Sequence, residues 1–438
     1  MTDYADLTNL AEILKNVYGE GLTNQFNDET TTYNMFPKSD RRPAGNGYIF
    51  GVRYSRTQST GGRAESAKLP APLTGTKDQG KINARYLYGS IRLTGPAIET
   101  AKNNVAAFVD GLADEMDDIY QSIVNDMNRQ AWGDGFGLIG TLSAAMTPST
   151  STTFNGTFNN DRGIQYFQEG MLLDFYDSTG ASPVSTCCGQ RVSSINPVTK
   201  VVTFAASGQT YLTDHPNATI AAYTNDATEV AVSSIAVKMG ARDAAWTSAD
   251  TPSEITGMMG LFDDGTLLSS FENITVASYP KWKANILSNS SVNRDLSLEL
   301  LLQAVDVTRI RSGKKVSRMY MGLGQRRKYA LLLMPDVRFA PTVLKGGYET
   351  LSFSGGDGTI EMVIDPLAQP NRIFMESGQE IKKYELTPLG WGNLDGSQMH
   401  RRAGYDEWDL FLRLYTNLGV EQRNCLTLLS DLVEPSLY

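Results

Sequence analysis

Gly135, Gly137 and Gly140 have the spacing of the fingerprint that cradles a dinucleotide pyrophosphate, within the stretch "WGDGFGLIG". In that fingerprint the glycines follow a buried strand and open a helix, whose N-terminus then faces the phosphates. Here they come after a helical pattern that ends at about Trp132, and no helical period follows them. Because the order is reversed, we predict that Gly133 and Gly135 end the helix and form a turn that needs positive φ.

The remaining reactive side chains are few and scattered. His215 and His400 lie in unrelated contexts, and neither zinc-ligand spacing nor a Gly-x-Ser-x-Gly motif occurs in the chain. Cys187 and Cys188 are adjacent and Cys425 is distant, a pattern that forms no disulfide framework and favours a reducing compartment. We therefore expect buried thiols, with no metal site and no nucleophilic triad.

Two Asp-Gly segments, "FDDGT" at 262–266 and "SGGDGT" at 354–359, superficially suggest calcium loops. Neither continues with the alternating oxygen ligands and final glutamate of such a loop, so both are interpreted as turns. Asp174 and Asp365 lie near predicted strands, but no second carboxylate pairs with either as an acid/base dyad. The sequence predicts no catalytic residue, no cofactor and no metal, hence no enzyme.

Composition narrows the class of protein further. The 438 residues are 41% hydrophobic and 20% charged, which is typical of a globular chain with a large core. With 39 basic and 48 acidic residues the formal net charge is −9, so nucleic-acid contact over the whole surface is excluded. The first residues lack the pattern of a signal peptide, and no apolar run reaches the ~20 residues of a membrane helix, so we expect an intracellularly made, soluble protein.

A long amphipathic helix is the clearest predicted element. Pro96 suits its first turn, and the pattern continues to Trp132, about 35 residues or roughly 50 Å at 1.5 Å per residue. Apolar residues recur in steps of three and four at Ile98, Ala101, Val105, Phe108 or Val109, Leu112, Met116, Ile119, Ile123 and Met127. The acidic residues mostly occupy the opposite side: Asp114, Glu115, Asp117, Asp118 and Asp126. That side is either a solvated face or a surface for a basic partner.

Before this helix we predict an arm and a protruding hairpin. Residues 1–45 have no sustained period, so they are interpreted as an extended arm whose aromatic residues cannot be buried without another surface: Phe26, Tyr33 and Phe36. Strands at 48–56 and 84–93 flank a loop rich in Gly, Ser, Thr and Pro. Basic residues crowd this protrusion: Arg53, Arg56, Arg63, Lys68 and Lys77. The opposite charges of this loop and of the acidic helix favour a head-to-tail contact between copies of the chain. The alternative interpretation is a basic loop that is only solvated.

The rest of the chain predicts an α+β fold. Residues 155–240 contain short alternating strands typical of a small antiparallel barrel or sandwich, with inward positions at Val192, Ile195, Val201, Val202 and Phe204. Further on we predict helices at 295–313 and 324–334 and a strand at 315–323. A hairpin follows at 348–366, and closing strands are predicted at 371–377, 382–386 and 408–422.

The order of these elements, with "AWGDGFGLIG" at 131–140 and the segments "GMMGLFDDGT" and "SYPKWKANILSN" around Trp282, resembles the major capsid proteins of tailed bacteriophages of the Hong Kong 97 type. The resemblance covers nearly the whole chain. It implies an N-terminal arm (1–45), an extended-loop hairpin (46–93), a spine helix with the start of a peripheral domain (94–154), an inserted β domain (155–240), a peripheral-domain return (241–299), and an axial domain with closing peripheral strands (300–438).

The resemblance also implies a function. Copies of the chain would form pentamers and hexamers of an icosahedral virion shell around double-stranded DNA, with scaffolding, portal and decoration proteins as further partners. The chain would be made in the host cytoplasm, with no membrane and no sequence-specific DNA contact. Inter-subunit candidates are Phe26, Tyr33, Phe36, Arg53, Arg56, Arg63, Lys68, Lys77, Asp114 and Asp118. Alternatives are a cellular nanocompartment shell of the same fold and a carbohydrate-binding β-domain protein. No loop lysine can be assigned to a covalent crosslink.

Overall fold

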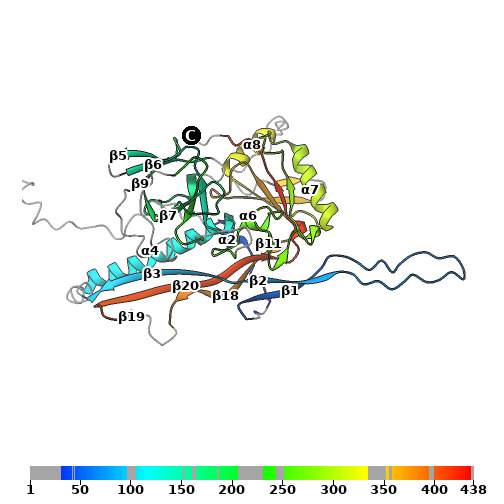
Figure 1. Cartoon of the computed structure of the whole chain (residues 1–438), viewed down its shortest axis with the longest axis horizontal. Helices are drawn as coiled ribbons and strands as arrows, with labels where there is room; N and C mark the ends of the chain where they lie inside the picture. Colours follow the sequence, from blue (N-terminus) through cyan, green and yellow to red (C-terminus); the bar gives the residue numbers. More distant parts are fainter. Residues whose placement is uncertain are drawn as a thin grey trace, which may run out of the picture.

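The computed structural model describes residues 31–41, 43, 45–95, 105–150, 153–159, 164–184, 187–205, 230–242, 251–333, 352–354, 358–393 and 399–435, with only the backbone of residues 31, 93, 105–115, 148–150 and 352–354. This part of the chain is α+β and its strands form five sheets. Figure 1 shows the hairpin of β1 and β2 at the base of the molecule, with the loop that joins the two strands projecting far beyond the body. None of the helices in the described ranges combines the length and apolar composition that crossing a membrane requires.

A long sheet forms the base of the molecule. Its central strand, β20 (Glu407–Val420), pairs antiparallel with β3 (Arg85–Thr94) along one edge. Its other edge pairs with β18 (Ile381–Trp391) and β19 (His400–Arg401). Alternate residues of these strands face the interior and are buried, as a half-covered antiparallel sheet requires: Leu87, Ile91, Leu410, Leu412 and Leu414.

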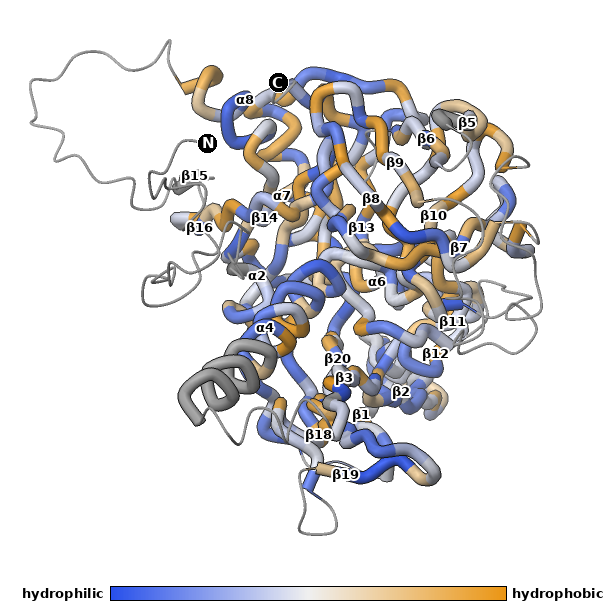
Figure 2. The backbone as a smooth tube through the Cα atoms, turned by 90° about the vertical axis from the view of Figure 1, so that its left-hand side faces the viewer, coloured by the Kyte–Doolittle hydropathy of each residue, from blue (hydrophilic) through white to orange (hydrophobic). Residues whose placement is uncertain are grey.

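Helix α4 (Val105–Trp132) packs against this sheet. Gly89 of β3 permits the approach, because a Cβ atom there would lie 2.6 Å from Cδ1 of Ile123. The predicted apolar stripe is confirmed where side chains are described, with Ile123 and Met127 buried and Ile119 half-buried. Polar and apolar residues therefore interleave along the helix (Figure 2). The predicted helix residues 96–104 lie outside the described part of the chain.

The helix ends at Trp132, as predicted, and the glycines after it shape a turn. Gly135 and Gly137 have positive φ angles of 91° and 67°, whereas Gly133 does not, so the prediction is right for Gly135 and wrong for Gly133. A Cβ at Gly137 would lie 2.2 Å from Cβ of Ala241. These glycines therefore serve close packing and a turn, in agreement with the rejection of a nucleotide loop.

The projecting hairpin consists of β1 (Gly47–Arg53) and β2 (Lys77–Asn83), paired antiparallel with Phe50 opposite Gly80. The prediction that residues 48–56 pair with residues 84–93 is therefore wrong. Residues 85–94 form β3 of the long sheet instead, and the polar segment 77–83 provides the hairpin partner.

A seven-stranded antiparallel sheet follows α4. One edge strand, which ends at Thr141, curls round to the strand that ends at Thr157, next to the far edge. Ser143 N–H donates to the Thr157 carbonyl (2.8 Å) and Asn159 N–H to the Thr141 carbonyl (2.8 Å), which gives a barrel-like form. Val192, Val202 and Phe204 are buried inside as predicted, while Ile195 and Val201 are half-buried. The sheet begins at Leu138, so the predicted start at 155 is too late. Its strand order is β4 (Leu138–Thr141), β10 (Ile235–Lys238), β7 (Leu172–Tyr176), β8 (Gln190–Asn196), β9 (Val201–Ala205), β6 (Thr153–Thr157) and β5 (Thr147–Thr150).

A six-stranded mixed sheet lies beside α7 (Leu298–Ser312) and α8 (Leu323–Leu333), close to the predicted helices. Helix α7 has regular caps, since the Ser297 hydroxyl accepts from Leu300 N–H and Gly313 is left-handed with φ 73°. The order of the strands is β13 (Asn285–Leu287), β21 (Thr427–Leu429), β17 (Ile373–Glu376), β14 (Arg318–Met321), β16 (Thr359–Ile364) and β15 (Ser352–Ser354). Shorter elements are α2 (Thr31–Met35), α6 (Met258–Leu261), β11 (Ser270–Phe271), β12 (Ile274–Thr275) and three single 3-10 turns, Ile164–Tyr166, Pro280–Trp282 and Arg423–Cys425.

Candidate functional site

The two strands of the projecting hairpin, residues 47–53 and 77–83, are here called the hairpin root. Aromatic side chains of these strands anchor the hairpin in the core. Phe50 is 3% exposed and fills the space above Gly80, where a Cβ would lie 2.4 Å from the phenyl ring. Its ring lies 6.0 Å from that of Trp282, and the Tyr48 ring lies 5.0 Å from that of Tyr384. The root is therefore part of the main core, and its direction is fixed by packing.

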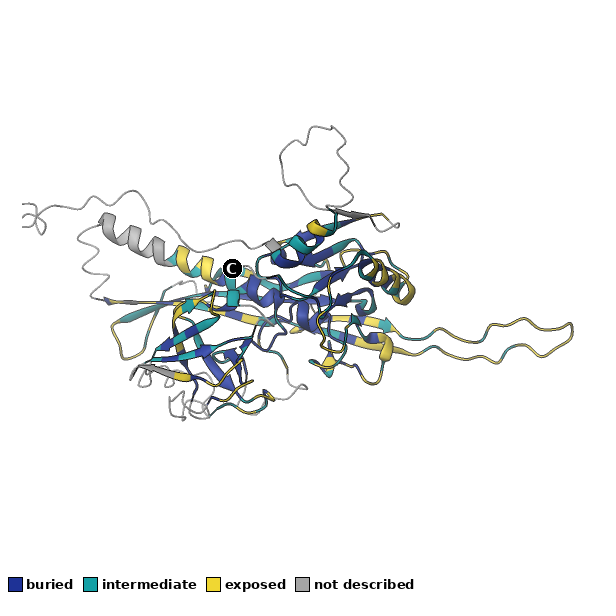
Figure 3. Ribbon diagram, turned by 90° about the horizontal axis from the view of Figure 1, so that it is seen from above, coloured by how far each residue is buried: buried dark blue, intermediate teal, exposed yellow. Residues whose placement is uncertain are grey.

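Beyond the root, residues 55–76 form a loop that leaves the body of the molecule. Tyr54 marks the exit: its ring stacks on Tyr279 at 3.9 Å, and its N–H donates to the Thr76 carbonyl at 3.0 Å. None of residues 55–76 is buried (Figure 3). The two sides of the loop are tied together by Ser59, whose hydroxyl donates to the Leu73 carbonyl (3.1 Å) and accepts from Leu73 N–H (2.6 Å).

Two leucines of this loop are conspicuously exposed. Leu69 is 80% exposed and Leu73 is 58% exposed, on a segment that touches little else of its own chain. Exposed apolar side chains grouped on a protrusion mark an interaction surface more strongly than single ones scattered over a body. Sequence reasoning considered only the cations of this loop, although "KLPAPL" at 68–73 carries an apolar signal.

The predicted basic residues do gather on the protrusion. Arg53 lies directly opposite Lys77 in the root, a like-charged pair that favours an anionic neighbour. Arg56, Arg63 and Lys68 follow along the loop and are exposed. Within the described residues, the ion pairs involve none of these five side chains. Their charges are therefore available to another molecule.

The predicted acidic face of α4 is exposed over part of its length. Asp117 and Asp118 are exposed beside Tyr120, whereas the side chain of Asp114 lies outside the described part of the chain. Figures 1 and 3 place this part of α4 at the opposite end of the molecule from the projecting loop. The structure thus brings the basic candidates together, and it separates them from the acidic ones within one chain.

The C-terminal part of α4, from Asp126 onward, differs from that exposed face. Asp126 binds Arg129 (2.8 Å) and Lys238 (2.8 Å), and Arg129 also binds Glu254 (2.6 Å), with the Arg129 side chain 6% exposed. Burial raises the pKa of Asp126, but the two cations more than offset it, so the pKa lies well below its ordinary range. The prediction of a solvated carboxylate is therefore wrong for Asp126, which links α4 to β10, while Arg129 links α4 to Glu254.

The arm residues Tyr33 and Phe36 are buried in their own chain, at 5% and 2% exposure. Tyr33 N–H donates to Asn128 of α4 (3.1 Å), and the Phe36 ring lies 6.0 Å from that of Tyr320. Burial raises the pKa of Tyr33 to about 12. The expectation that these two aromatics need another subunit for burial is wrong, and Phe26 lies outside the described residues.

The other candidate chemical groups have structural roles. Asp365 accepts hydrogen bonds from Thr32, Asn128 and Leu367, and Asp174 accepts from the N–H groups of Gly189 and Gly240. Asp263 of "FDDGT" accepts from three N–H groups of its own turn, as a turn residue does. In the described ranges, no three His, Cys, Asp or Glu side chains are grouped as metal ligands. The three cysteines are free and buried, and burial raises the thiol pKa of Cys188 and Cys425.

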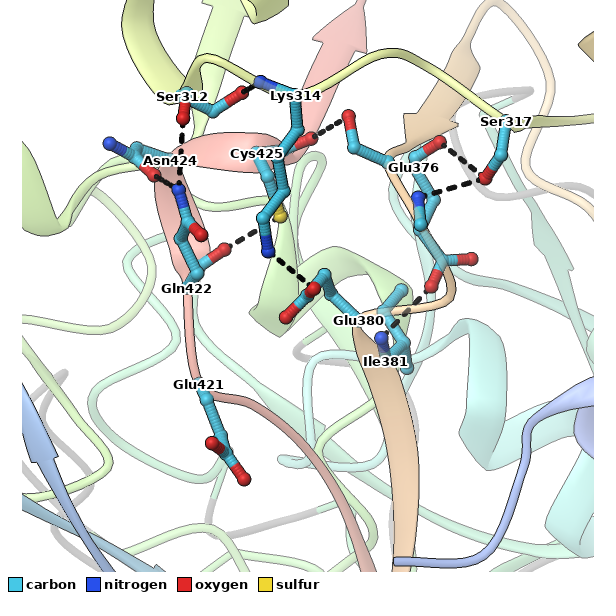
Figure 4. Close-up of polar contacts among 12 residues, drawn as sticks. Ser312, Lys314, Ser317, Glu376, Glu380, Ile381, Glu421, Gln422, Asn424 and Cys425 are labelled. Atoms are coloured by element: carbon cyan, nitrogen blue, oxygen red, sulfur yellow. Dashed lines mark hydrogen bonds and ion pairs between the residues drawn. The ribbon is translucent and has the colours of Figure 1, made fainter.

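The long sheet and the six-stranded sheet meet at a joint where two connections run side by side, 377–380 and 421–426 (Figure 4). The Ser377 hydroxyl donates to the Cys425 carbonyl at 3.1 Å, and Gln422 donates to the Ser312 carbonyl at the end of α7 at 3.3 Å. Lys314 forms an ion pair with Glu380 across the same joint. These contacts fix the two sheets relative to each other, and thereby the body that carries the hairpin root.

Sequence reasoning also missed an aromatic patch on the outer face of the long sheet. Tyr86 and Tyr88 are 48% and 60% exposed, and their rings lie 5.0 Å and 5.9 Å from that of Tyr415. The alternation in "ARYLYGSIRL" carries the signal, because every second residue of a strand shares one face. Tyrosine is enriched in protein interfaces, so this face joins the loop as a candidate contact surface.

Comparisons with solved structures identify the fold. The chain is similar to the capsid asymmetric unit of cyanophage A-1(L), with a TM-score of 0.56 at 11% identity over 96% of this chain and 98% of the other. Weaker likenesses are to the capsid of Myoviridae phage XM1 (TM-score 0.45, 11% identity, covering 97% and 98%) and to the capsid of the native GTA particle (TM-score 0.48, 9% identity, covering 99% and 100%). No family model and no curated protein matches the sequence.

The likeness to the cyanophage structure spans both chains almost completely, so it concerns the architecture as a whole. The chain therefore has the fold of a phage capsid protein. The resemblance seen in the sequence is confirmed at the level of the fold.

Proposed function

We propose that this chain is the major capsid protein of a tailed bacteriophage, which self-assembles into pentamers and hexamers of an icosahedral shell around double-stranded DNA. The observation that carries the proposal is the projecting loop, residues 55–76, with exposed Leu69 and Leu73 on a root fixed in the core. In a chain with a capsid-protein fold, such a loop has its natural contact surface on a second copy.

The proposed contact joins the loop of one copy to the α4 side of the next. Cations at Arg56, Arg63 and Lys68 complement the exposed carboxylates of Asp117 and Asp118. Because the two surfaces differ and lie at opposite ends of the molecule, the contact is head-to-tail, which closes into rings when the rotation per copy divides a full turn. Modest energies per contact suffice, since each copy in a ring is held by several neighbours.

We assign the parts of the chain by the Hong Kong 97-type layout. Residues 1–45 are the arm, 46–93 the extended-loop hairpin, 94–154 the spine helix with the start of the peripheral domain, and 241–299 its return. Residues 300–438 are the axial domain with the closing strands. The barrel-like sheet is the inserted domain, whose start we now place at Leu138, so that the spine-helix part of 94–154 is shortened to 94–137.

The charge balance supports a wall that encloses DNA without gripping it. A net charge of −9 disfavours tight, non-specific binding to phosphates, so packaged DNA can slide along the inner surface. We propose a virion location, synthesis in the host cytoplasm, and contacts with scaffolding, portal and decoration proteins. We propose no catalytic activity for the chain.

The test is assembly of the purified full chain, alone and co-expressed with the scaffolding protein of its own phage. Sedimentation velocity and electron microscopy should reveal closed shells of uniform size, and particles from infected cells should protect double-stranded DNA from nuclease. A chain that stays monomeric in both preparations would contradict the proposal. Uniform shells from infected or native cells that hold protein cargo and no DNA would indicate a nanocompartment instead.

A further inference from the structure

Glu272 lies at the hairpin root in an unfavourable backbone conformation. It and Asn273 form the tip between β11 and β12, with φ angles of 51° and 63°. A two-residue turn with both φ angles positive is ordinarily made by Asn-Gly or Asp-Gly, because a longer side chain is strained there. Glutamate at the first position of such a turn indicates that interactions of its side chain hold the strained conformation.

That side chain and its backbone connect two structures. The Glu272 carbonyl accepts from Lys81 N–H of β2 at 2.9 Å, and its carboxylate Oε1 accepts from Val420 N–H at the end of β20 at 2.9 Å. Gly419 lets the two structures touch, since a Cβ there would lie 2.5 Å from Ile82 Cδ1 and 3.0 Å from Glu272 Oε1. One residue therefore joins the hairpin root to the long sheet.

The second carboxylate oxygen is in a different position. Atom Oε2 of Glu272 is buried and has no hydrogen-bond partner among the described residues, as is also true of Oδ1 of Asn83 and Nε of Arg85. All three residues line one polar cavity of about 120 Å³, together with Lys81 and Asn417. A cavity of this size has room for several water molecules, which gives protons a route to the carboxylate.

The charges around Glu272 leave its ionised form poorly compensated. Burial raises the pKa of Glu272 to about 8, the Val420 N–H and Arg423 lower it, and Glu421 raises it. Arg423 is itself held by the carbonyls of Gly260 and Leu261. The charged and titratable groups that face Glu272 from the neighbouring elements are Lys81, Arg85, Tyr384, Glu421 and Arg423.

We infer that Glu272 is a pH-sensitive contact that holds the hairpin root to the long sheet when protonated and weakens that attachment when ionised. This contact would regulate the hairpin that we propose to join neighbouring subunits, so the inference rests on the proposed function. The closed state binds the proton more tightly than an open state, in which the carboxyl regains its ordinary pKa of 4.5. The attachment is therefore strongest below that value, weakens as pH rises, and is weakest above pH 8.

Hydrogen exchange on the unassembled full chain tests the inference. After correction for intrinsic exchange, protection at Lys81 and Val420 should fall by up to tenfold for each pH unit between about 5 and 8. Strand β14 serves as an internal reference whose protection should stay flat. Glu272→Gln keeps the shape without the charge, so its protection should not change with pH. Glu299→Gln, an exposed control in the first turn of α7, should behave as wild type.

The inference is overturned if wild-type protection at these two sites is independent of pH, or if Glu272→Gln retains the wild-type pH dependence. Should Glu272→Gln fail to fold, the wild-type comparison of the root with β14 still decides the question. Because the measurement uses unassembled protein, failure of shell formation would contradict the proposed function and leave this result standing. A flat profile in a chain that forms shells would contradict only the role of Glu272.

Discussion

Replacing Leu69 and Leu73 with serine removes the two apolar side chains that the projecting loop presents to solvent, at 80% and 58% exposure. Full burial of a leucine side chain contributes about 1.5–3 kcal/mol of free energy, and because both leucines are mostly exposed in the single chain, most of this can be gained only by contact with another molecule. With both leucines buried on a neighbour, the double substitution should cost about 3 kcal/mol per contact, roughly a 100-fold loss in association constant. The folded subunit itself should change by less than about 0.5 kcal/mol, because exposed side chains contribute little to it.

Two assays separate these effects. Urea unfolding of unassembled protein measures the stability of the subunit, and sedimentation velocity over a concentration series gives the threshold for assembly. Val198→Ser is the matched control, because Val198 is 64% exposed in the seven-stranded sheet region, away from the loop. The reasoning is refuted if the double variant assembles at the wild-type threshold. It is equally refuted if the subunit loses more than about 1 kcal/mol, since the loop would then be packed on its own chain.

Three further substitutions test the architecture by urea unfolding. Phe50→Ala empties a 3%-exposed site of the hairpin root and should cost about 3–5 kcal/mol; a loss under 1 kcal/mol would mean that the root is loose. Arg129→Ala leaves two carboxylates without their shared cation and should cost about 3–5 kcal/mol, whereas Lys328→Ala, which breaks a pair with a 77%-exposed aspartate, should cost under about 1 kcal/mol. Equal losses of stability in Arg129→Ala and Lys328→Ala would contradict the difference between the buried and the exposed ion pair. Gly137→Ala introduces a Cβ atom 2.2 Å from Cβ of Ala241, at a residue with φ 67°. It should destabilise the protein more than Gly404→Ala, where φ is 83° and the space is open, and where we expect a loss of about 1–2 kcal/mol. A larger loss for Gly404→Ala than for Gly137→Ala would refute the packing argument.

Elements with local signals were predictable from the sequence. The end of α4 at Trp132 is marked by the glycines after it, and α7 by Ser297 and Gly313 at its two ends. These signals work because capping and turn chemistry depend on residues adjacent in the chain. The same holds for the alternation that identified Val192 and Phe204 as inward residues of the barrel-like sheet.

The features that could not be predicted from the sequence depend on contacts between residues far apart in the chain. The segment "KDQGKIN" at 77–83 is polar and resembles loop, yet Gly80 and Ile82 make it a strand because Phe50 and the end of β20 pack there. Tyr33 and Phe36 are buried against residues such as Tyr320, which no local pattern reveals. Among the candidate site residues, the cations of the loop were found from composition, whereas Glu272 required the fold to bring its neighbours together.

The most direct test of the central claim is a cryo-electron microscopy map of the assembled particle at side-chain resolution. Residues 55–76 of each subunit should show continuous density that lies on the α4 side of an adjacent copy, with Leu69 and Leu73 covered and Arg56, Arg63 or Lys68 near Asp117 and Asp118. A particle in which this loop extends into solvent, with both leucines uncovered, would contradict the claim.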